Sequence, residues 1–196
     1  MYRKDIVGWL LDNEVAAIEK FCGLCPKGHD IIEVGPFAGR TTQIIADICK
    51  SSTIYSIDPW PITESGIVWE GQNYEGPGYD SSDIEGIFQK EILDVFPNVV
   101  KIKGQFPEDL PTEYTRNIGW VHWDTDNVFD ENAENRMREQ FSYAWSLLPV
   151  GGLLSGHTFA GWMPKVVTAV RNFAEWEAKA EVILPPNGST WYLLKR

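Results

Sequence analysis

Apolar residues along this chain form two kinds of pattern that alternate. Short apolar runs bounded by turn residues, which are typical of buried strands, occur at 30–34, 52–58, 98–104, 118–124 and 153–157. Around them, apolar residues recur with a helical period, which predicts helices at 5–22, 40–50, 84–96, 132–148 and 164–178. The last two runs, 180–186 and 189–196, flank the turn signal Asn187-Gly188 and predict a terminal hairpin.

Strands that alternate with helices and end in a hairpin predict an α/β fold, a three-layer Rossmann-like sandwich. Its sheet should have seven strands, mostly parallel, with the C-terminal hairpin antiparallel. The 196 residues contain no internal repeat and no long linker, so we expect a single domain over 1–196. The longest interruption, 60–83, is rich in Gly, Pro and aromatic residues. Connections of this length are often lids, so 60–83 is a candidate lid, with a self-packed loop or an oligomer contact as alternatives.

Five tryptophans lie inside the predicted helices and strands, where the apolar period points them inward. We therefore expect them in the core: Trp120, Trp123, Trp145, Trp176 and Trp191.

Composition bears on partners more than on fold. With 17 basic and 28 acidic residues the formal net charge is −11, and such a surface would repel a phosphate backbone, so we expect no nucleic-acid partner. No apolar run is long enough to span a membrane, and the first residues lack the pattern of a cleavable leader. We therefore expect no membrane partner and a cytoplasmic protein. Whether the chain forms a homo-oligomer is left open.

The three cysteines are too few for a disulfide framework, and their odd number suits a reducing compartment. Cys22 and Cys25 have C-x-x-C spacing, with His29 close behind and Cys49 further along the chain. A zinc site would need all four side chains to converge. A redox pair would need the motif at a thioredoxin-like strand-to-helix turn, where it does not lie. We expect ordinary thiols.

The most informative stretch is EVGPFAG, residues 33–39, between a predicted buried strand and a predicted helix. Its glycines are spaced G-x-x-x-G, which is neither the dinucleotide pattern G-x-G-x-x-G nor a Walker loop. A carboxylate at this turn would repel a phosphate, whereas it suits a ligand with positive charge or free donors. The second strand ends in Asp58, where an acid that binds a ribose diol lies in nucleotide-binding sheets.

Acids at two strand ends, with exposed backbone between them, describe a site for a nucleoside without a pyrophosphate. S-adenosylmethionine fits that description. Glu33 would engage its amino group, Gly35 would let its methionine portion lie against the backbone, and Asp58 would hold the ribose hydroxyls. The alternative is a tight structural turn with a helix cap, which is the better interpretation for Gly35 taken alone.

The order of these motifs resembles that of class I S-adenosylmethionine-dependent methyltransferases. More narrowly, it is similar to the small O-methyltransferases that include macrocin O-methyltransferase, with catechol O-methyltransferase as a more distant relative. The resemblance runs from about residue 14 to 196, and 60–83 matches poorly. It is carried by IIEVGPFAGRTTQIIA, TIYSIDPW, NVVKIKGQFPEDLP and VHWDTDNVFDENAENRMREQFSYAWSLLPVGGLLSGHTF.

The resemblance implies methyl transfer from S-adenosylmethionine to an oxygen of a small-molecule acceptor, a sugar or secondary metabolite. The cofactor-binding residues that it implies are Glu33, Gly35, Pro36, Phe37, Ala38, Gly39, Thr41, Asp58, Pro59, Trp60, Gln105, Phe106 and Asp124. Two other functions stay open. One is a non-catalytic nucleoside-binding protein on the same fold, and the other is a nicotinamide-dependent oxidoreductase.

Transfer to a hydroxyl requires a group that removes its proton. His157 is the first candidate for this catalytic role, because its ordinary pKa lies close to working pH. Asp124 would orient it or accept the proton itself, and Asp126 follows on the same loop. The alternatives are a core imidazole bonded to a carbonyl for His157, a cap or cofactor contact for Asp124, and a charge at a helix N-terminus for Asp126.

The resemblance fails at the positions that bind a metal in metal-dependent relatives. Thr158 stands where those relatives carry Asp, and Asn127 replaces a usual His. Hard cations such as Mg²⁺ prefer several oxygens, mainly carboxylates. We therefore expect no bound divalent metal; if one bound, its ligands would be Asp124, Asp126 and Thr158.

Overall fold

The computed structural model describes residues 3–8, 10–60, 84–125, 131–186 and 188–196. The candidate lid at 60–83 lies outside the described residues except for Trp60. Among the helices of the described residues, none has the length and apolarity that a membrane span requires.

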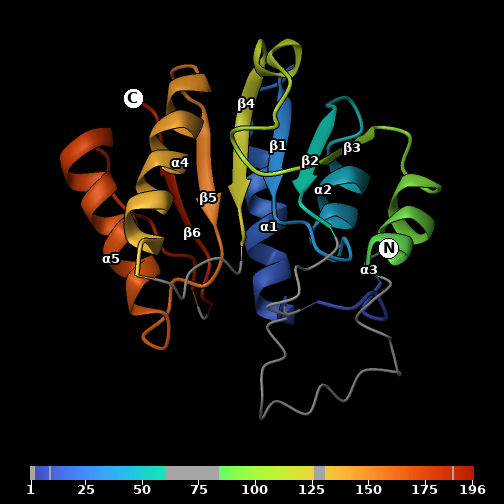
Figure 1. Ribbon diagram of the computed structural model, residues 1–196, viewed down its shortest axis with the longest axis horizontal. Coiled ribbons are helices and arrows are strands. Elements are labelled where there is room, and N and C mark those ends of the chain that lie inside the picture. Colours follow the sequence, from blue (N-terminus) through green and yellow to red (C-terminus); the bar gives the residue numbers. More distant parts are fainter. Residues whose placement is uncertain (1–2, 9, 61–83, 126–130, 187) are drawn as a thin grey trace.

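A six-stranded sheet forms the centre of the described chain, in the order β3-β2-β1-β4-β5-β6. Its strands are β1 (Asp30–Val34), β2 (Ile54–Asp58), β3 (Val99–Lys103), β4 (Ile118–Trp123), β5 (Leu153–Gly156) and β6 (Trp191–Leu194). The first five pair in parallel, and β6 is antiparallel to β5. Figure 1 shows the carboxyl ends of the parallel strands at one common edge, called the carboxyl edge below.

The helices alternate with the strands. They are α1 (Asp12–Leu24), α2 (Thr42–Ile48), α3 (Ile84–Phe88), α4 (Ala133–Leu147) and α5 (Pro164–Asn172). A 3-10 turn, η3 (Thr112–Thr115), precedes β4, and two π-helical segments, η2 (Gln89–Leu93) and η4 (Phe173–Ala178), continue α3 and α5 without a break. The predicted helices at 84–96 and 164–178 therefore exist, but each changes its winding part-way.

Apolar side chains cover both faces of the sheet, and successive residues of one strand pack on opposite faces. Ile32 of β1 belongs to a cluster that includes residues of α4 and α5, whereas Ile31 belongs to a cluster with residues of α1 and α2. Val121 and Trp120 of β4 divide in the same way. With both faces covered, the carboxyl edge is where polar side chains of several strands can converge.

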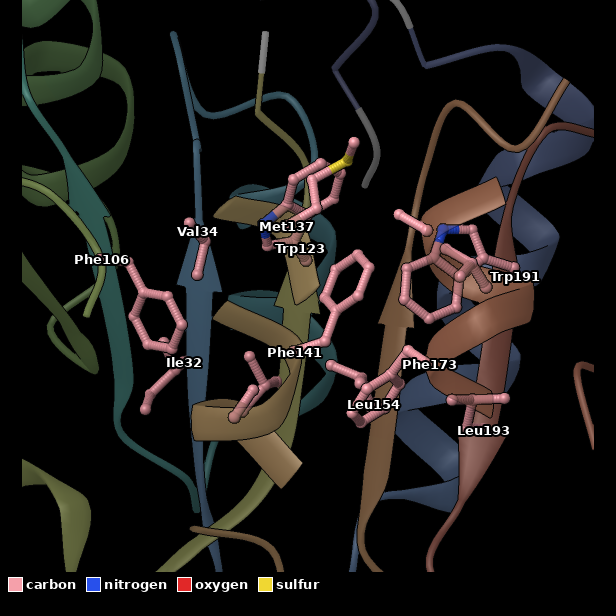
Figure 2. Close-up of a cluster of buried hydrophobic side chains, with 14 of the residues drawn as sticks. Ile32, Val34, Phe106, Trp123, Met137, Phe141, Leu154, Phe173, Trp191 and Leu193 are labelled. Atoms are coloured by element: carbon pink, nitrogen blue, oxygen red, sulfur yellow. The ribbon is translucent and has the colours of Figure 1, made fainter. Parts of the chain in front are cut away.

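Figure 2 shows the cluster on the α4 and α5 side. The rings of Trp123 and Phe141 meet edge to face with centroids 5.2 Å apart, and Phe141 meets Trp191 at 5.4 Å. Trp123 also donates its indole N–H to Gln140 Oε1 at 2.9 Å. Because Trp123 is the last residue of β4, this packing fixes the backbone position at which Asp124 follows the strand.

The predicted sheet has seven strands, one more than the sheet of the described residues. Of the predicted run 180–186, only Ile183 pairs with the sheet, through an isolated antiparallel bridge to Tyr192 of β6. The two residues exchange backbone hydrogen bonds of 2.9 and 3.0 Å. Pro185 and Pro186 follow, and proline has no N–H to continue a ladder. The antiparallel pair at the C-terminus is thus β5 with β6.

The first helix begins later than the predicted 5–22. Helix α1 starts at Asp12, and the described residues before it, 3–8 and 10–11, contain no helix or strand and reach the start of α2. There Gln43 exchanges hydrogen bonds of 2.9 Å with the backbone of Arg3. Ile6 and Leu10 are nevertheless buried, so their apolar spacing reported burial and not a helix.

Candidate cofactor and acceptor site

Glycine is required at both ends of the turn after β1. Gly35 has φ +76°, and a Cβ there would lie 1.7 Å from the carbonyl oxygen of Asp124. Gly39 has φ +94°, and its Cβ would lie 2.2 Å from Cγ1 of Ile92. Both backbones occupy the left-handed region and leave no room for a side chain. Packing of the chain on itself is sufficient to explain both glycines.

Asp58, at the end of β2, holds this turn in place. Its two carboxyl oxygens accept hydrogen bonds from the backbone N–H groups of Phe37, at 3.3 Å, and Trp60, at 3.1 Å. The indole N–H of Trp60 donates in turn to the carbonyl of Phe37 at 3.1 Å. Burial raises the pKa of Asp58 to about 6, against the lowering effect of these hydrogen bonds.

Glu33 lies beneath the same turn with 1% of its surface exposed. One carboxyl oxygen, Oε2, accepts from the hydroxyl of Ser56 at 3.0 Å, while Oε1 has no hydrogen-bond partner among the described residues. Burial raises the pKa of Glu33 to about 7 against the lowering effect of the hydroxyls of Thr42 and Ser56, and the charges of Asp124 and Asp58 add to the increase. A buried acid with an unused oxygen is costly unless a ligand with a positive charge or a donor group binds beside it.

Two predicted cofactor-binding aromatics belong to the core. Trp60 is buried against Phe88, with ring centroids 4.9 Å apart. Phe106 is buried against Tyr143 in an edge-on contact at 5.6 Å, and Figure 2 shows it beside β1. These rings support the loops of the carboxyl edge and present little surface to a ligand. Among the other predicted positions, Pro36 and Ala38 are buried, Phe37 and Thr41 are half-buried, and Pro59 and Gln105 are exposed.

Asp124 and His157 meet where β4 and β5 end. The N–H of Asp124 donates to the carbonyl of Val34 at 2.9 Å, and that of His157 donates to the carbonyl of Trp123 at 3.2 Å. Their side chains are in contact, with His157 Nδ1 3.3 Å from Asp124 Oδ2. The third predicted catalytic residue, Asp126, lies outside the described residues.

The pKa of His157 does not lie close to working pH, which was the reason to predict it as the general base. Its other ring nitrogen, Nε2, lies 3.1 Å from Oε2 of Glu14, a residue of α1 that sequence reasoning did not single out. Burial lowers the pKa of His157, but Asp124 and Glu14 outweigh burial and raise that pKa to about 10. In Glu14, burial would raise the pKa, but the contact with His157 and the backbone hydrogen bonds from Leu11 and Ser189 together lower that pKa to about 2. The imidazole is therefore a cation at neutral pH, held between two carboxylates.

No family model matches the chain, and no curated protein matches its sequence. Solved structures are similar to it in fold. A TDP-rhamnose 3'-O-methyltransferase of calicheamicin biosynthesis has a TM-score of 0.64 at 14% identity, covering 94% of this chain and 81% of the other. The O-methyltransferase NovP has a TM-score of 0.63 at 15% identity, and the match covers 93% of this chain and 79% of NovP. An rRNA methylase from Streptococcus thermophilus has a TM-score of 0.61 at 15% identity, and the match covers 96% of this chain and 99% of the methylase.

The fold is that of the class I S-adenosylmethionine-dependent methyltransferases. At such low identity the similarity establishes the fold and leaves the activity and any acceptor open. Among the described residues, the acids Glu33, Asp58 and Asp124 lie at or within one residue of the carboxyl ends of three adjacent strands, β1, β2 and β4. Such a grouping of carboxylates favours a ligand with positive charge.

Thr158 stands where the resemblance implies Asp in metal-dependent relatives, and its backbone conformation is unusual. It has φ +63°, a left-handed conformation that is unusual for a β-branched residue, and its hydroxyl donates to the carbonyl of His157 at 2.7 Å. Within the described parts of the chain, no three His, Cys, Asp or Glu side chains are placed to hold a metal ion. Asp126 and Asn127 lie outside those parts. The three cysteines are free thiols, and Cys22 is buried.

Proposed function

We propose that this protein is an S-adenosylmethionine-dependent methyltransferase that acts on an oxygen of a small molecule. The observation that carries the proposal is the buried carboxyl group of Glu33, with one oxygen unpartnered among the described residues and a raised pKa, beside Asp58 and Asp124. Such a site favours a cation, and it disfavours the pyrophosphate of a nicotinamide cofactor. The methyltransferase fold supports the same cofactor.

When bound, S-adenosylmethionine would supply the methyl group from its sulfonium and retain the electron pair of the broken carbon–sulfur bond. Glu33 would bind the amino group with its unused oxygen. Asp58 would accept the ribose hydroxyls, since the backbone of Phe37 and Trp60 already fixes its orientation. These roles leave Asp124 for the acceptor.

Asp124 is our candidate for the group that receives the proton of the acceptor hydroxyl. It replaces His157 in that role because both ring nitrogens of His157 already face carboxylates, at 3.1 and 3.3 Å. A ring in that position has no nitrogen left to receive a proton. The side chain of Asp124 is 29% exposed, so an acceptor can reach it. Asp126 remains a second candidate from the sequence.

Calorimetric titration of the purified protein with S-adenosylmethionine, and separately with NAD, tests the cofactor. We expect S-adenosylmethionine to bind, and Glu33→Gln and Asp58→Asn each to weaken it about tenfold or more, the usual loss on removing one charge-assisted contact. Glu113→Gln, an exposed acid in η3, is the matched control and should bind normally. Binding of NAD without S-adenosylmethionine would refute the proposal in favour of an oxidoreductase.

Turnover with a panel of acceptors then separates an enzyme from a non-catalytic binding protein. The neighbour that methylates TDP-rhamnose makes nucleotide sugars the first acceptors to test. The rRNA methylase of the same fold makes an RNA oligonucleotide a necessary arm. We expect methylation of a small molecule and none of RNA, because the net charge of −11 opposes a polyanion. Turnover should survive metal chelation.

A further inference from the structure

Glu14 is more completely bonded than its place in a helix requires. It lies in the first turn of α1 with 1% of its side chain exposed. Oε2 accepts from the N–H of Leu11 at 3.0 Å and faces Nε2 of His157 at 3.1 Å. Oε1 accepts from both the N–H and the hydroxyl of Ser189, at 2.9 and 2.7 Å. Capping α1 uses only the bond to Leu11, so the remaining contacts call for another explanation.

The contacts of Glu14 continue through His157 to Asp124. A neutral imidazole has one N–H and can donate to only one of the two carboxylates, so bonds to both need a proton on each nitrogen. The ring thus links the carboxylate of Glu14 in α1 to that of Asp124, which directly follows β4 and is distant in sequence. These three side chains lead from the interior towards the surface, because the exposed side-chain fraction is 1% at Glu14, 8% at His157 and 29% at Asp124.

The backbone of His157 is fixed as firmly as its ring. Its N–H donates to the carbonyl of Trp123 at 3.2 Å. Its own carbonyl accepts from the indole of Trp191 at 3.3 Å and from the hydroxyl of Thr158 at 2.7 Å. With the main chain held, the two carboxylates determine the ring orientation, and removal of either one frees it to turn.

We propose that Glu14 is a positioning residue for methyl transfer: acting through His157, it fixes the carboxylate of Asp124 at the carboxyl edge of the sheet. This inference rests on the proposed function, in which Asp124 receives the acceptor's proton. Transfer between bound groups is sensitive to displacements of about 1 Å, which can lower rates about 100-fold. Glu14 itself is buried and contacts neither substrate nor cofactor in this role.

Glu14→Gln is the central variant, because the amide retains the size of the side chain and an oxygen for the cap at Leu11. We expect kcat to fall about 10- to 100-fold, with the Kd for S-adenosylmethionine within about threefold of the wild-type value. Asn98→Ala is the matched control for lost stability. Asn98 directly precedes β3, at the end of the sheet opposite the carboxyl edge, and its amide donates to three backbone carbonyls in α2 and the loop between α2 and β2, so Tm should fall while kcat stays unchanged.

A double-mutant cycle tests whether Glu14 acts through His157. If it does, Glu14→Gln combined with His157→Gln should lower kcat no further than His157→Gln alone. Multiplied losses would overturn the proposal, as would a Glu14→Gln enzyme with normal kcat. A wild-type protein that neither binds S-adenosylmethionine nor turns over any acceptor would instead refute the proposed function.

A structural measurement keeps the test independent of the acceptor. In a crystal structure of Glu14→Gln we expect both the ring of His157 and the carboxylate of Asp124 to have moved from their positions in the wild-type protein. An unchanged Asp124 would overturn the proposal whatever the acceptor is. If Glu14→Gln does not fold, Ser189→Ala takes its place, since it removes only one of the two bonds to Oε1. We expect a loss of kcat of about threefold to tenfold, and a normal kcat would contradict the inference.

Discussion

Glu33 makes the cost of the site measurable at the scale of one residue. Burial raises its pKa from the ordinary 4.5 to about 7, so the folded state favours the protonated acid. The favourable contribution is complete below pH 4.5 and is lost as pH rises to about 7. The loss is on the order of 3 kcal/mol, at about 1.4 kcal/mol per pKa unit. Glu33→Gln should therefore gain stability relative to wild type over this range, as measured by urea unfolding at several pH values. Parallel curves for the two proteins would contradict the raised pKa.

The same residue, with Asp58, should make cofactor binding depend on pH. The pKa of Asp58 is about 6 and that of Glu33 about 7, and a cation binds to their ionised forms. Lowering the pH from about 7.5 to about 5.5 should weaken binding of S-adenosylmethionine on the order of 10- to 100-fold, with protons released on binding. Calorimetry in two buffers of different ionisation enthalpy counts those protons. Glu33→Gln should release fewer, and an equal count would exclude Glu33.

Single residues also mark how far the sequence could be interpreted. The positions of Glu33, Asp58 and Asp124 at one edge could be predicted because each lies at the carboxyl end of a strand or within one residue of it, and these ends meet at one edge. The contact of Glu14 with His157 could not be predicted, because the two residues lie 143 positions apart and no local pattern links them. The burial of the Trp60 side chain in the core could not be predicted either, because an aromatic side chain suits a binding site and a core equally well, and its role at the cofactor stays a prediction.

At the scale of elements, the junction of β1 and β4 depends on Gly35. Gly35 and Gly28 have the same φ of +76°, but only Gly35 has a neighbour, the Asp124 carbonyl, within reach of a Cβ. Gly28→Ala should therefore cost about 1–2 kcal/mol for backbone conformation alone. Gly35→Ala should cost at least about 2 kcal/mol more, because the end of β4 must move. Urea unfolding of both variants measures the difference. Equal costs would show that the turn can relax.

Elements were predicted well where a periodic pattern was uninterrupted and less well where the backbone departed from it. Helix α4 lies within its predicted range, as does β4. Trp176 was expected in the core from its helical spacing but is 59% exposed. It lies in the π-helical segment η4, where each residue turns through a smaller angle than in an α-helix, so the inward face shifts. Apolar spacing does not reveal such a change of winding.

At the scale of the whole molecule, the charge of −11 should favour the cofactor over its product. S-adenosylmethionine carries a net positive charge through its sulfonium, whereas S-adenosylhomocysteine is neutral overall. A negative protein attracts the former at long range, and salt screens that attraction. Raising the salt from about 50 to about 500 mM should therefore weaken binding of S-adenosylmethionine about threefold to tenfold.

S-adenosylhomocysteine supplies the matched comparison, because it retains the amino group for Glu33 and the ribose for Asp58. Its Kd should change less than about twofold over the same salt range, since only the sulfonium charge is missing. Calorimetric titrations of both ligands at each salt concentration measure the two slopes. Equal slopes would mean that the carboxylates at the edge bind the amino group and ribose without sensing the sulfonium. The charge of the whole molecule would then have no part in selecting the methyl donor.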